Sequence, residues 1–423
     1  MKAVILAGGK GTRLGELAAA MPKPLVPVAG VALLEHQLRL LARCGAEEVF
    51  ILSGYLAGQI RDFAGDGGKY GLKIRHIAES APLGTAGALR QMQGVAGGDF
   101  IVLYGDIMLD MDLRRLLDFH KAKAAACTLV IHPNDHPFDS DLVAVDGGSR
   151  ITAVHSKPHQ PGLWLRNLAN TGVCVMSEAA LNCIPEGVKS DFVHDILPGM
   201  VSRLPVYGYA TPEYLKDIGT PERLAKAERD LLSGKIAAFN LKNKRRAVFL
   251  DRDGVINREK GLISRPEDFE LLPGAAEAVS NINAAGFLAV VATNQPVVAR
   301  SLCGIETVEL IHRKMETLLG EKGAYLDAVY YCPHHPDKGY PGENAAYKID
   351  CACRKPKPGM LLRAAAELNI DLSGSYMAGD SKRDLDCARA AGVKAIAVGG
   401  LSGGDIDCAD LAAAAEIITG AGK

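Results

Sequence analysis

Residues 247–257, AVFLDRDGVIN, decide the fold expected for the second half of this 423-residue chain. Four apolar residues, 247–250, predict a short buried strand, and the strand ends at two carboxylates, Asp251 and Asp253, with only Arg252 between them. Two acids placed side by side at the carboxyl end of a strand can divide the work of a nucleophile and a proton donor. Because the two anions would repel each other and an incoming phosphate, the motif also predicts a bound cation.

Both halves of the chain alternate short apolar strands with helical stretches, which predicts an α/β fold of two doubly wound domains. In the second half we expect strands at 247–251, 287–294, 327–333, 375–380 and 394–400, and helices at 273–286, 304–323 and 357–369. In the first half we expect strands at 3–7, 47–53, 99–106 and 126–133, and helices at 31–45, 112–126 and 220–234. Thr220 is the expected N-cap of the last of these helices. We therefore predict domains at 1–232 and 247–423, joined by a basic linker at 233–246.

Composition and charge limit the kinds of partner. The net charge of −1 and the absence of a long Lys/Arg run argue against a nucleic-acid partner. No apolar stretch approaches 18 residues, and the first residues do not resemble a signal peptide, so no membrane partner is expected. The ten cysteines are scattered without a secretory signal, which favours free thiols in a reducing cytoplasm. The sequence predicts a cytoplasmic protein with small-molecule substrates and leaves the oligomeric state open.

The paired acids predict phosphoryl chemistry. Asp251 would attack a phosphorus atom, while Asp253 would first donate a proton to the leaving oxygen and later accept one from water. Mg²⁺ held by Asp251, by the carbonyl of Asp253 and by Asp380, at the end of a later strand, would offset the negative charge. Asp384 lies just behind Asp380 in the segment MAGDSKRD.

Two further segments supply groups for a phosphate. VATN, 291–294, offers the hydroxyl of Thr293, and CRKPKPG, 353–359, offers Arg354 and Lys355 as charge clamps. Spacing alone leaves Lys357 as an alternative to Lys355.

The four segments, each at a strand end or in a following loop, occur in the order that resembles the haloacid dehalogenase-like phosphatases. That resemblance favours Lys355 as the clamp. It also implies that Asn294, next to Thr293, contacts the sugar phosphate.

A possible metal cluster lies between these segments. Cys332 and His334 are followed, after 16 residues, by Cys351 and Cys353, and three thiolates with one imidazole suit tetrahedral Zn²⁺. His335 is an alternative to His334 as the imidazole ligand. We expect the zinc to be structural, since it would close a loop that lacks apolar residues and would position Arg354 and Lys355.

With the cluster included, the second half resembles the subfamily of heptose-bisphosphate 7-phosphatases and histidinol-phosphate phosphatases. The segments DRDGVIN, TNQ, YYCPHHP and CRKPKPGM carry this resemblance. The chain departs from the subfamily after TNQ, where Pro296, Val297 and Val298 replace a small residue and Gly-Ile. The resemblance implies substrate contacts at residues 259–261, namely Glu259, Lys260 and Gly261.

The first strand leads into a different phosphate loop, LAGGKGTRL at 6–14. Gly8, Gly9 and Gly11 allow backbone amides to approach a phosphate chain, and Arg13 can fork onto phosphate oxygens. The loop matches neither the Walker motif nor the dinucleotide fingerprint. Lys23 follows between two prolines, where a rigid cation suits a reaction at an α-phosphate.

The loop and the PKP segment resemble those of sugar-1-phosphate nucleotidyltransferases, which implies a Rossmann-like first domain. In this family the positions of Asp106 and Asp217 hold Mg²⁺, which would make both active sites magnesium-dependent. The resemblance further implies nucleotide contacts from the loop and from the segment AESAPLGTAG, at Ala7, Gly8, Gly9, Gly11, Thr12, Arg13, Lys23, Glu79 and Gly84. It implies sugar-phosphate contacts at Asn170, Thr171, Gly172 and Lys157, although Ser156 replaces the acidic residue that usually precedes this lysine.

Glu79 occupies the base-reading position implied by the resemblance. A carboxylate accepts hydrogen bonds from the two adjacent donors of guanine but faces an acceptor on adenine. We therefore expect GTP to be preferred over ATP.

The two halves together predict a bifunctional enzyme. Removal of the 7-phosphate from D-glycero-D-manno-heptose 1,7-bisphosphate would leave a heptose 1-phosphate, which a guanylyltransferase would convert into GDP-D-glycero-α-D-manno-heptose. Two alternatives remain open: a transferase for another sugar, such as mannose 1-phosphate, with a histidinol-phosphate phosphatase, and a phosphatase regulated by a nucleotide-sugar-sensing first half.

Overall fold

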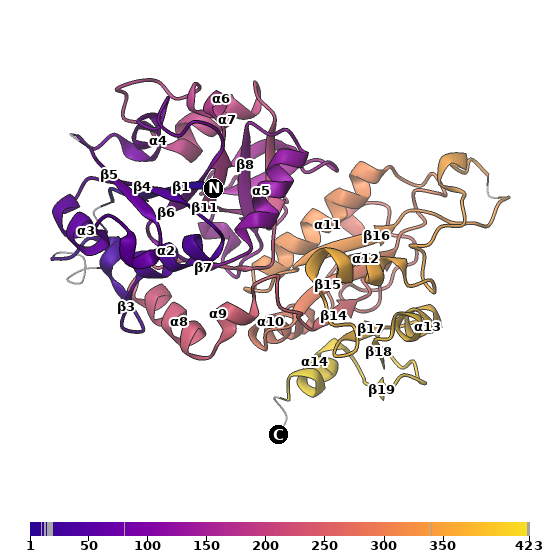
Figure 1. Ribbon diagram of the computed structural model, residues 1–423. Coiled ribbons are helices and arrows are strands. Elements are labelled where there is room, and N and C mark those ends of the chain that lie inside the picture. The colour runs from indigo at the N-terminus through magenta and orange to yellow at the C-terminus, as the bar shows by residue number, and fades with distance from the viewer. Residues whose placement is uncertain (10, 12–13, 15–19, 80, 340, 421–423) are drawn as a thin grey trace. The chain divides into compact units, whose positions relative to one another are not determined.

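The computed structural model describes residues 1–9, 11, 14, 20–79, 81–339 and 341–420. It divides into two compact units, one of residues 1–132, 143–156 and 170–241, the other of residues 133–142, 157–169 and 242–423. This division differs from the predicted domains, because two internal segments of the first half belong to the second unit. Each unit contains helices and a β-sheet (Figure 1).

The first unit contains most of a nine-stranded mixed sheet, in the order β10-β9-β11-β6-β1-β4-β5, with β8 paired to β11 and β12 paired to β8. Its central strands β6, β1, β4 and β5 are parallel, whereas β11 runs antiparallel to β6. The strands are β1 Lys2–Ala7, β4 Glu48–Ser53, β5 Lys73–Ala78, β6 Phe100–Tyr104, β8 Cys127–His132, β9 Leu142–Val145, β10 Ile151–His155, β11 Ala169–Met176 and β12 Val206–Ala210. Two small antiparallel pairs accompany it, β2 Pro27–Val28 with β3 Val31–Ala32, and β7 Ile107–Asp110 with β13 Tyr214–Asp217.

The longer helices of this unit lie near the expected positions. They are α2 Leu33–Arg43, α3 Ala57–Ala64, α4 Gly84–Arg90, α5 Leu113–Ala122 and α8 Pro221–Leu232, with short turns of helix at η2 Lys23–Leu25, η3 Gly68–Tyr70, η5 Phe192–Ile196, α6 Glu178–Leu181, α7 Leu197–Val201 and α9 Lys235–Ala238. The hydroxyl of Thr220 accepts a hydrogen bond from the Arg223 amide at 3.3 Å, so this residue is the N-cap that the sequence predicts. The predicted linker is partly helical, since α9 lies within it and buries Ile236.

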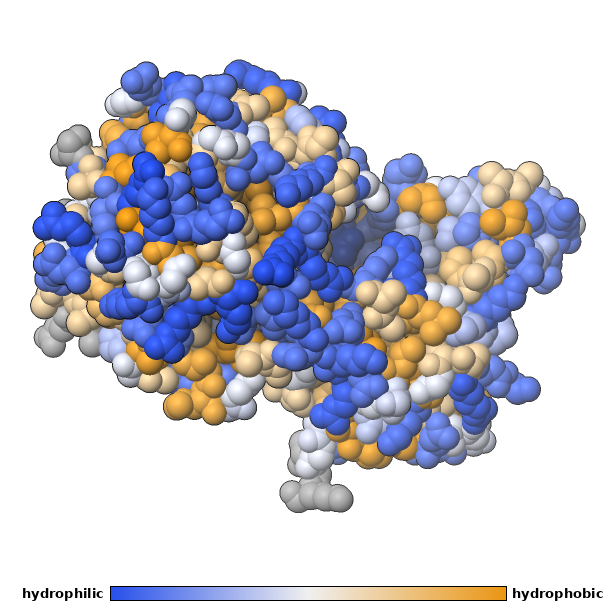
Figure 2. Space-filling view, viewed as in Figure 1, coloured by the Kyte–Doolittle hydropathy of each residue, from blue (hydrophilic) through white to orange (hydrophobic). Residues whose placement is uncertain are grey.

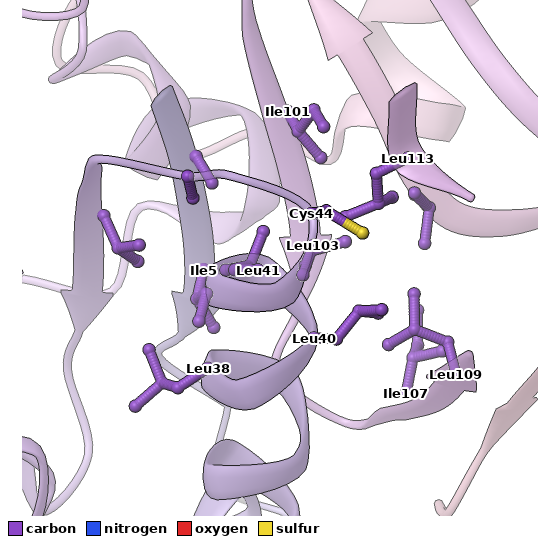
Figure 3. Close-up of a cluster of buried hydrophobic side chains, with 14 of the residues drawn as sticks. Ile5, Leu38, Leu40, Leu41, Cys44, Ile101, Leu103, Ile107, Leu109 and Leu113 are labelled. Carbon is purple, nitrogen blue, oxygen red and sulfur yellow. The ribbon is translucent and has the colours of Figure 1, made fainter. Parts of the chain in front are cut away.

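The core of the first unit lies between α2 and the sheet. Every third or fourth residue of α2 is apolar, so one face of the helix packs on the strands. Figure 3 shows Leu41 beside Ile5 of β1, and Leu40 pointing toward Leu109 of β7. These side chains fix the strand whose end carries the glycine loop.

The second unit contains a parallel sheet of six strands in the order β16-β15-β14-β17-β18-β19. The strands are β14 Ala247–Leu250, β15 Leu288–Asn294, β16 Ala328–Cys332, β17 Tyr376–Gly379, β18 Lys394–Ala397 and β19 Ile406–Asp407. The helices are α10 Ala275–Ala284, α11 Ile305–Gly320, α12 Gly359–Leu368, α13 Lys382–Ala391 and α14 Leu411–Thr419, with short turns at η4 Pro137–Asp139, η6 Pro266–Asp268 and η7 Ala345–Tyr347.

Both faces of this second sheet are covered. Val248 and Leu250 of β14 face a cluster formed with α10, α11 and α14, whereas Ala247 and Phe249 face a cluster formed with α12 and α13. Successive strand residues point to opposite faces, so this division shows helices on both sides of the sheet. The doubly wound arrangement predicted for the second half is confirmed.

Helix α11 anchors one of the two internal segments that join the second unit. Its Glu316 carboxylate pairs with Arg166 at 2.6 Å and accepts a hydrogen bond from the Asn167 amide at 2.8 Å. Thr317 exchanges two hydrogen bonds with the backbone of Leu165, at 3.0 and 3.2 Å. These polar contacts, which have no periodic signature in the sequence, explain why segment 157–169 departs from the predicted domain.

Hydrophilic and hydrophobic residues are interspersed in small patches on the face shown in Figure 2. Among the described helices, none combines the length and the hydropathy that a bilayer crossing requires.

Leu41→Ala should destabilise the first unit by about 2–5 kcal/mol, because it opens a cavity in a fully buried cluster. Hydrogen-exchange mass spectrometry of strand β1 in moderate urea would measure the loss. Leu232→Ala, at a site with 78% exposure, is the matched control and should leave exchange unchanged. Equal protection in both variants would contradict the assigned core.

Candidate functional site

The carboxyl edge of the second sheet gathers three acidic side chains. Asp251 follows β14, Asp380 follows β17, and Asp384 lies in the first turn of α13. Strands β14 and β17 are hydrogen-bonded neighbours, so their ends meet, and one oxygen from each acid lies within 4.8 Å of the others. Gly254 permits this approach, since a Cβ at that position would overlap the Asp380 carboxylate.

Lys355 lies between two of these acids. Its ammonium is 2.9 Å from Asp251 and 2.6 Å from Asp384, and the side chain is almost completely buried. Burial by itself would lower the pKa of Lys355, but the charges of the two aspartates outweigh it and raise that pKa. Asn294 fixes the lysine backbone, since its side-chain amide donates to the Lys355 carbonyl at 3.1 Å and accepts from the Lys355 amide at 3.0 Å.

The acid cluster has the chemistry of a cation site. Burial raises the pKa of Asp251, and burial together with the charge of Asp251 raises the pKa of Asp380 to about 6. Three carboxylates facing one ammonium leave a net negative charge in a partly buried position. Oxygen ligands of this kind fit a hard divalent cation.

Asp253 points its carboxylate to a different set of partners. Arg252, which is completely buried, donates to both oxygens at 2.8 and 2.9 Å. Asn257 donates to one oxygen at 3.0 Å, and Gln295 donates to the other at 2.8 Å. The side chain of Asp253 is therefore absent from the group of three acids, and a metal contact through its carbonyl stays a prediction.

The other residues that the sequence predicts for the phosphatase site are Thr293, Arg354 and Lys357, and each has different partners. Thr293 is buried at the end of β15 and accepts a hydrogen bond from Gln295 at 3.0 Å. Arg354 donates to the carbonyl of His334 at 3.0 Å, which ties it to the cysteine loop. Lys357 is exposed and pairs with Asp350 at 2.5 Å, so Lys355 rather than Lys357 is the lysine beside Asp251.

The four predicted zinc ligands converge. The three sulfur atoms of Cys332, Cys351 and Cys353 are 3.1–3.4 Å apart, and the Nδ1 atom of His334 is 3.5 Å from Cys353 and 3.7 Å from Cys332. Hydrogen bonding from Cys332 lowers the pKa of the Cys353 thiol to about 5. Soft donors at these separations fit one tetrahedral metal ion. The Nδ1 atom of His335 instead accepts from the Asp337 amide at 3.2 Å.

A second pocket lies in the first unit, at the carboxyl end of β1. It is a cavity of about 370 Å³. Its lining includes the predicted residues Ala7, Gly8, Gly9, Lys23, Glu79, Gly84 and Asp106, together with Leu6, Pro24, Pro82, Thr85, Ala88, Tyr104, Gly105 and Lys189.

One ion pair lines this cavity, and the predicted metal ligand Asp217 belongs to a second ion pair outside the lining. The ammonium of Lys23, which is buried, lies 2.5 Å from the carboxylate of Asp106. Asp217 lies on β13, beside β7, where the amide of Ile218 donates to the Asp106 carbonyl at 2.9 Å. Burial opposes ionisation of Asp217, but hydrogen bonds from Arg223 at 2.8 Å outweigh it and lower the pKa of this aspartate. Two carboxylates on adjacent strands can hold a divalent cation.

Glu79 faces the glycine loop. A Cβ at Gly8 would lie 3.2 Å from one of its carboxylate oxygens, and a Cβ at Gly54 would lie 3.4 Å from the other. Burial raises the pKa of Glu79. Its carboxylate accepts a hydrogen bond from the backbone of Leu83, the residue that precedes α4.

The structure does not test several predicted transferase residues. Thr12 and Arg13 fall outside the described residues, and Gly11 is not among the residues that line the cavity. The ammonium of Lys157 pairs with Asp139 at 2.8 Å within the second unit. These assignments stay predictions.

The segment 170–172 has structural roles of its own. The hydroxyl of Thr171 donates to the Val130 carbonyl at 2.9 Å. A Cβ on Gly172 would crowd Tyr104, a residue of the cavity wall, and Asn170 lies beside them on β11. The predicted sugar-phosphate contacts of this segment are untested.

The predicted substrate segment 259–261 is near the acid cluster. The charge of Glu259 contributes to the raised pKa of Asp380, after burial and the charges of Asp251 and Asp384. Lys260 pairs with Glu270 at 3.0 Å, and the Gly261 amide donates to Glu259 at 2.6 Å.

Sequence reasoning left several residues of the two sites without a role. In the second unit, Asp384 was named only as lying behind Asp380 and is a member of the acid group, and Gln295 joins Asp253 to Thr293. In the first unit, Thr85, Tyr104 and Lys189 line the cavity. Asp384 carried a signal, since it lies one helical turn beyond Asp380, whereas the cavity residues have no motif of their own.

Comparison with known proteins separates the chain into two parts. A nucleotidyl transferase family model matches residues 2–234, and a HAD-hydrolase-like model matches residues 352–416. The mannose-1-phosphate guanylyltransferase of Mycobacterium tuberculosis is 33% identical over 235 residues, which are 55% of this chain and 65% of that relative. The D-glycero-beta-D-manno-heptose-1,7-bisphosphate 7-phosphatase of Yersinia pestis is 41% identical over 147 residues, which are 35% of this chain and 76% of that relative.

A solved structure supports the fold of the first part. A protein from Bacillus anthracis, assigned as a glucose-1-phosphate thymidylyltransferase, matches with a TM-score of 0.50 and 22% identity. The match covers 54% of this chain and 94% of that one.

Cys353→Ser should remove a tightly bound metal ion, because it replaces one of four converging donors with a poorer ligand. Elemental analysis of protein purified without chelator would give the metal content per chain. Cys303→Ser, outside the cluster, is the control and should retain the metal. Unchanged metal content in Cys353→Ser would contradict the assignment.

Proposed function

Because the chain belongs to the nucleotidyl transferase family through residues 2–234 and its second part belongs with the heptose-bisphosphate phosphatases, we propose that it is a bifunctional enzyme of activated-heptose synthesis. The second unit removes the 7-phosphate of D-glycero-D-manno-heptose 1,7-bisphosphate. The first unit then transfers a nucleotidyl group to the heptose 1-phosphate and releases pyrophosphate. One observation carries this function: the product of the phosphatase relatives is a sugar 1-phosphate, the kind of substrate that sugar nucleotidyltransferases use.

The phosphatase reaction has two steps. In the first, an oxygen of Asp251 attacks the 7-phosphorus, the bond to the sugar oxygen breaks, and that oxygen takes a proton from Asp253. In the second, water loses a proton to Asp253 and attacks the phosphorus, which releases inorganic phosphate and restores Asp251. Lys355 and the hydroxyl of Thr293 bind the phosphate oxygens during both steps, and their burial strengthens these interactions.

The transferase reaction is a single displacement. An oxygen of the heptose 1-phosphate attacks the α-phosphorus of the nucleotide, and the bond to the β-phosphate breaks. Lys23, fixed beside Asp106, offers positive charge where negative charge builds up. Arg13 is assigned to the same task from its motif.

Metal ions supply the remaining positive charge. We assign Mg²⁺ to Asp251, Asp380 and the carbonyl of Asp253 in the phosphatase, with Asp384 as a further candidate ligand beside them. In the transferase we assign Mg²⁺ to Asp106 and Asp217, and at both sites the ion would offset phosphate charge. We assign Zn²⁺ to the cysteine and histidine cluster, where it closes the loop that leads to Lys355.

A second candidate has support from one relative. The guanylyltransferase of Mycobacterium tuberculosis is named for mannose 1-phosphate, so this sugar is the alternative substrate of the first unit. A regulatory first half is a further alternative, and it predicts nucleotide binding without turnover.

One experiment separates these functions. The protein is supplied with each anomer of the heptose bisphosphate, or with mannose 1-phosphate, together with GTP or ATP. Pyrophosphate and phosphate release are followed, and the sugar nucleotide is identified by mass spectrometry. GDP-heptose formation from the bisphosphate supports the proposed function, whereas GDP-mannose alone favours the alternative.

Asp251→Asn should abolish phosphate release while transferase activity on heptose 1-phosphate stays near normal, because the nucleophile is lost from one site only. Lys23→Ala should do the reverse. Both activities of each variant would be measured with separate substrates. Loss of both activities in either variant would contradict independent sites.

Glu79→Gln should reduce the preference for GTP over ATP by about tenfold or more, because the amide presents a donor to the base where the carboxylate presented acceptors. The ratio of kcat/KM values for the two nucleotides measures this preference. Glu48→Gln, which changes a carboxylate outside the cavity lining, is a suitable control. An unchanged ratio in Glu79→Gln would exclude the base-reading role.

A further inference from the structure

We propose that Gln295 is a positioning residue that holds the proton donor Asp253 of the phosphatase in place from a neighbouring strand. The inference rests on the proposed phosphatase activity and concerns a residue to which no role was assigned above. Gln295 directly follows β15, whereas Asp253 lies in the loop after β14.

The side-chain nitrogen of Gln295 contacts two functional groups. It donates to an oxygen of Asp253 at 2.8 Å and to the hydroxyl of Thr293 at 3.0 Å. The residue has only 2% exposure, so this amide is shielded from water and both hydrogen bonds are formed within the protein. One amide group thus fixes the distance between the proton donor and a phosphate-binding hydroxyl.

Gln295 differs in origin from the other partners of Asp253. Arg252 and Asn257 belong to the same loop as Asp253, and the Arg252 guanidinium also lies 3.4 Å from the Nε2 atom of His312 on α11. Among the donors to this carboxylate in the described part of the chain, Gln295 is the one from outside the loop, directly after β15. It therefore sets the position of the loop acid relative to the sheet.

The backbone of Gln295 extends the link to the cysteine cluster. Its amide donates to the carbonyl of Cys332, the first predicted zinc ligand, at 2.7 Å. The preceding residue, Asn294, binds the backbone of Lys355, which lies two residues after the ligand Cys353. The loop with the cysteine and histidine cluster is therefore hydrogen-bonded to Gln295, which contacts the proton donor. Through Asn294 the same strand end is also hydrogen-bonded to the backbone of the phosphate-binding lysine.

Positioning of a proton donor has a specific kinetic signature. The sugar oxygen of an alkyl phosphate leaves as a strongly basic alkoxide unless it is protonated, so its departure depends on Asp253. The nitrophenolate of p-nitrophenyl phosphate is a much weaker base and leaves with little assistance. Asp253 also accepts a proton from water in the second step, which both esters share, so the comparison uses kcat/KM, which reports the first step. A defect confined to Asp253 placement therefore lowers kcat/KM for the alkyl ester and spares kcat/KM for the aryl ester.

The test compares Gln295→Leu with the wild type on heptose bisphosphate and on p-nitrophenyl phosphate. We expect kcat/KM for the sugar phosphate to fall about tenfold to a hundredfold, and kcat/KM for the aryl ester to fall less than about threefold. Gln295→Met, an unbranched replacement without a donor, is used if the leucine variant does not fold. Activity on the aryl ester shows that the variant retains an assembled site.

Two reference variants make the result specific. Asn283→Leu removes another buried amide, on α10, whose oxygen accepts a hydrogen bond from the Tyr325 backbone amide at 3.1 Å. This substitution should not change the ratio of the two activities. In an Asp253→Asn background, the Gln295 substitution should have no further effect on the sugar phosphate.

The outcomes distinguish the inference from the function on which it rests. If the wild type hydrolyses neither ester, the proposed phosphatase function is wrong. If the wild type is active but Gln295→Leu lowers kcat/KM equally for both esters, or if its effect adds fully to that of Asp253→Asn, the positioning role is overturned.

Discussion

The ion pairs of one buried lysine hold the phosphatase site together. Lys355 lies between Asp251 and Asp384 with 2% exposure of its side chain, so its charge acts in a medium that screens it weakly. Without this ammonium, three acidic groups would face each other at the end of the sheet, and burial would favour their protonation. Two further constraints keep the lysine there: the paired hydrogen bonds from Asn294 and the metal loop that ends at Cys353.

The loop that carries the cysteine and histidine cluster has little material for a hydrophobic core. Between β16 and α12 the chain is rich in proline and charged residues, and it has few apolar side chains with which to fold. Four converging ligands give this loop a defined shape that packing would not provide. Arg354 and Lys355 follow the last ligand directly, so the same ion that would order the loop would also place the cations near the acids. Arg354 and Lys355 would thus both be positioned by the same cluster of ligands.

Much of the phosphatase site could be predicted because its chemistry lies at strand ends. Asp251 and Asp380 follow runs of apolar residues, and neighbouring parallel strands bring such ends together whatever the loops do. The role of Gln295 could not be predicted, since a glutamine after a strand has no sequence signature. Its role becomes visible only when the hydrogen bonds of its side chain and its backbone are known. In the first half, Lys23 and Glu79 were accessible through a family motif, but the pairing of Lys23 with Asp106 depends on tertiary structure. The short strands of that half, such as β7 and β13, are too brief to show a period.

The attachment of segment 157–169 to α11 has a consequence during synthesis on the ribosome. Asn167 leaves the ribosome long before its partner Glu316, which is 149 residues further along the chain. At about 5–20 residues per second, the segment waits roughly 7–30 s for that partner. The segment therefore completes these contacts only after α11 has been translated, and a nascent chain stalled before α11 would carry this segment unanchored.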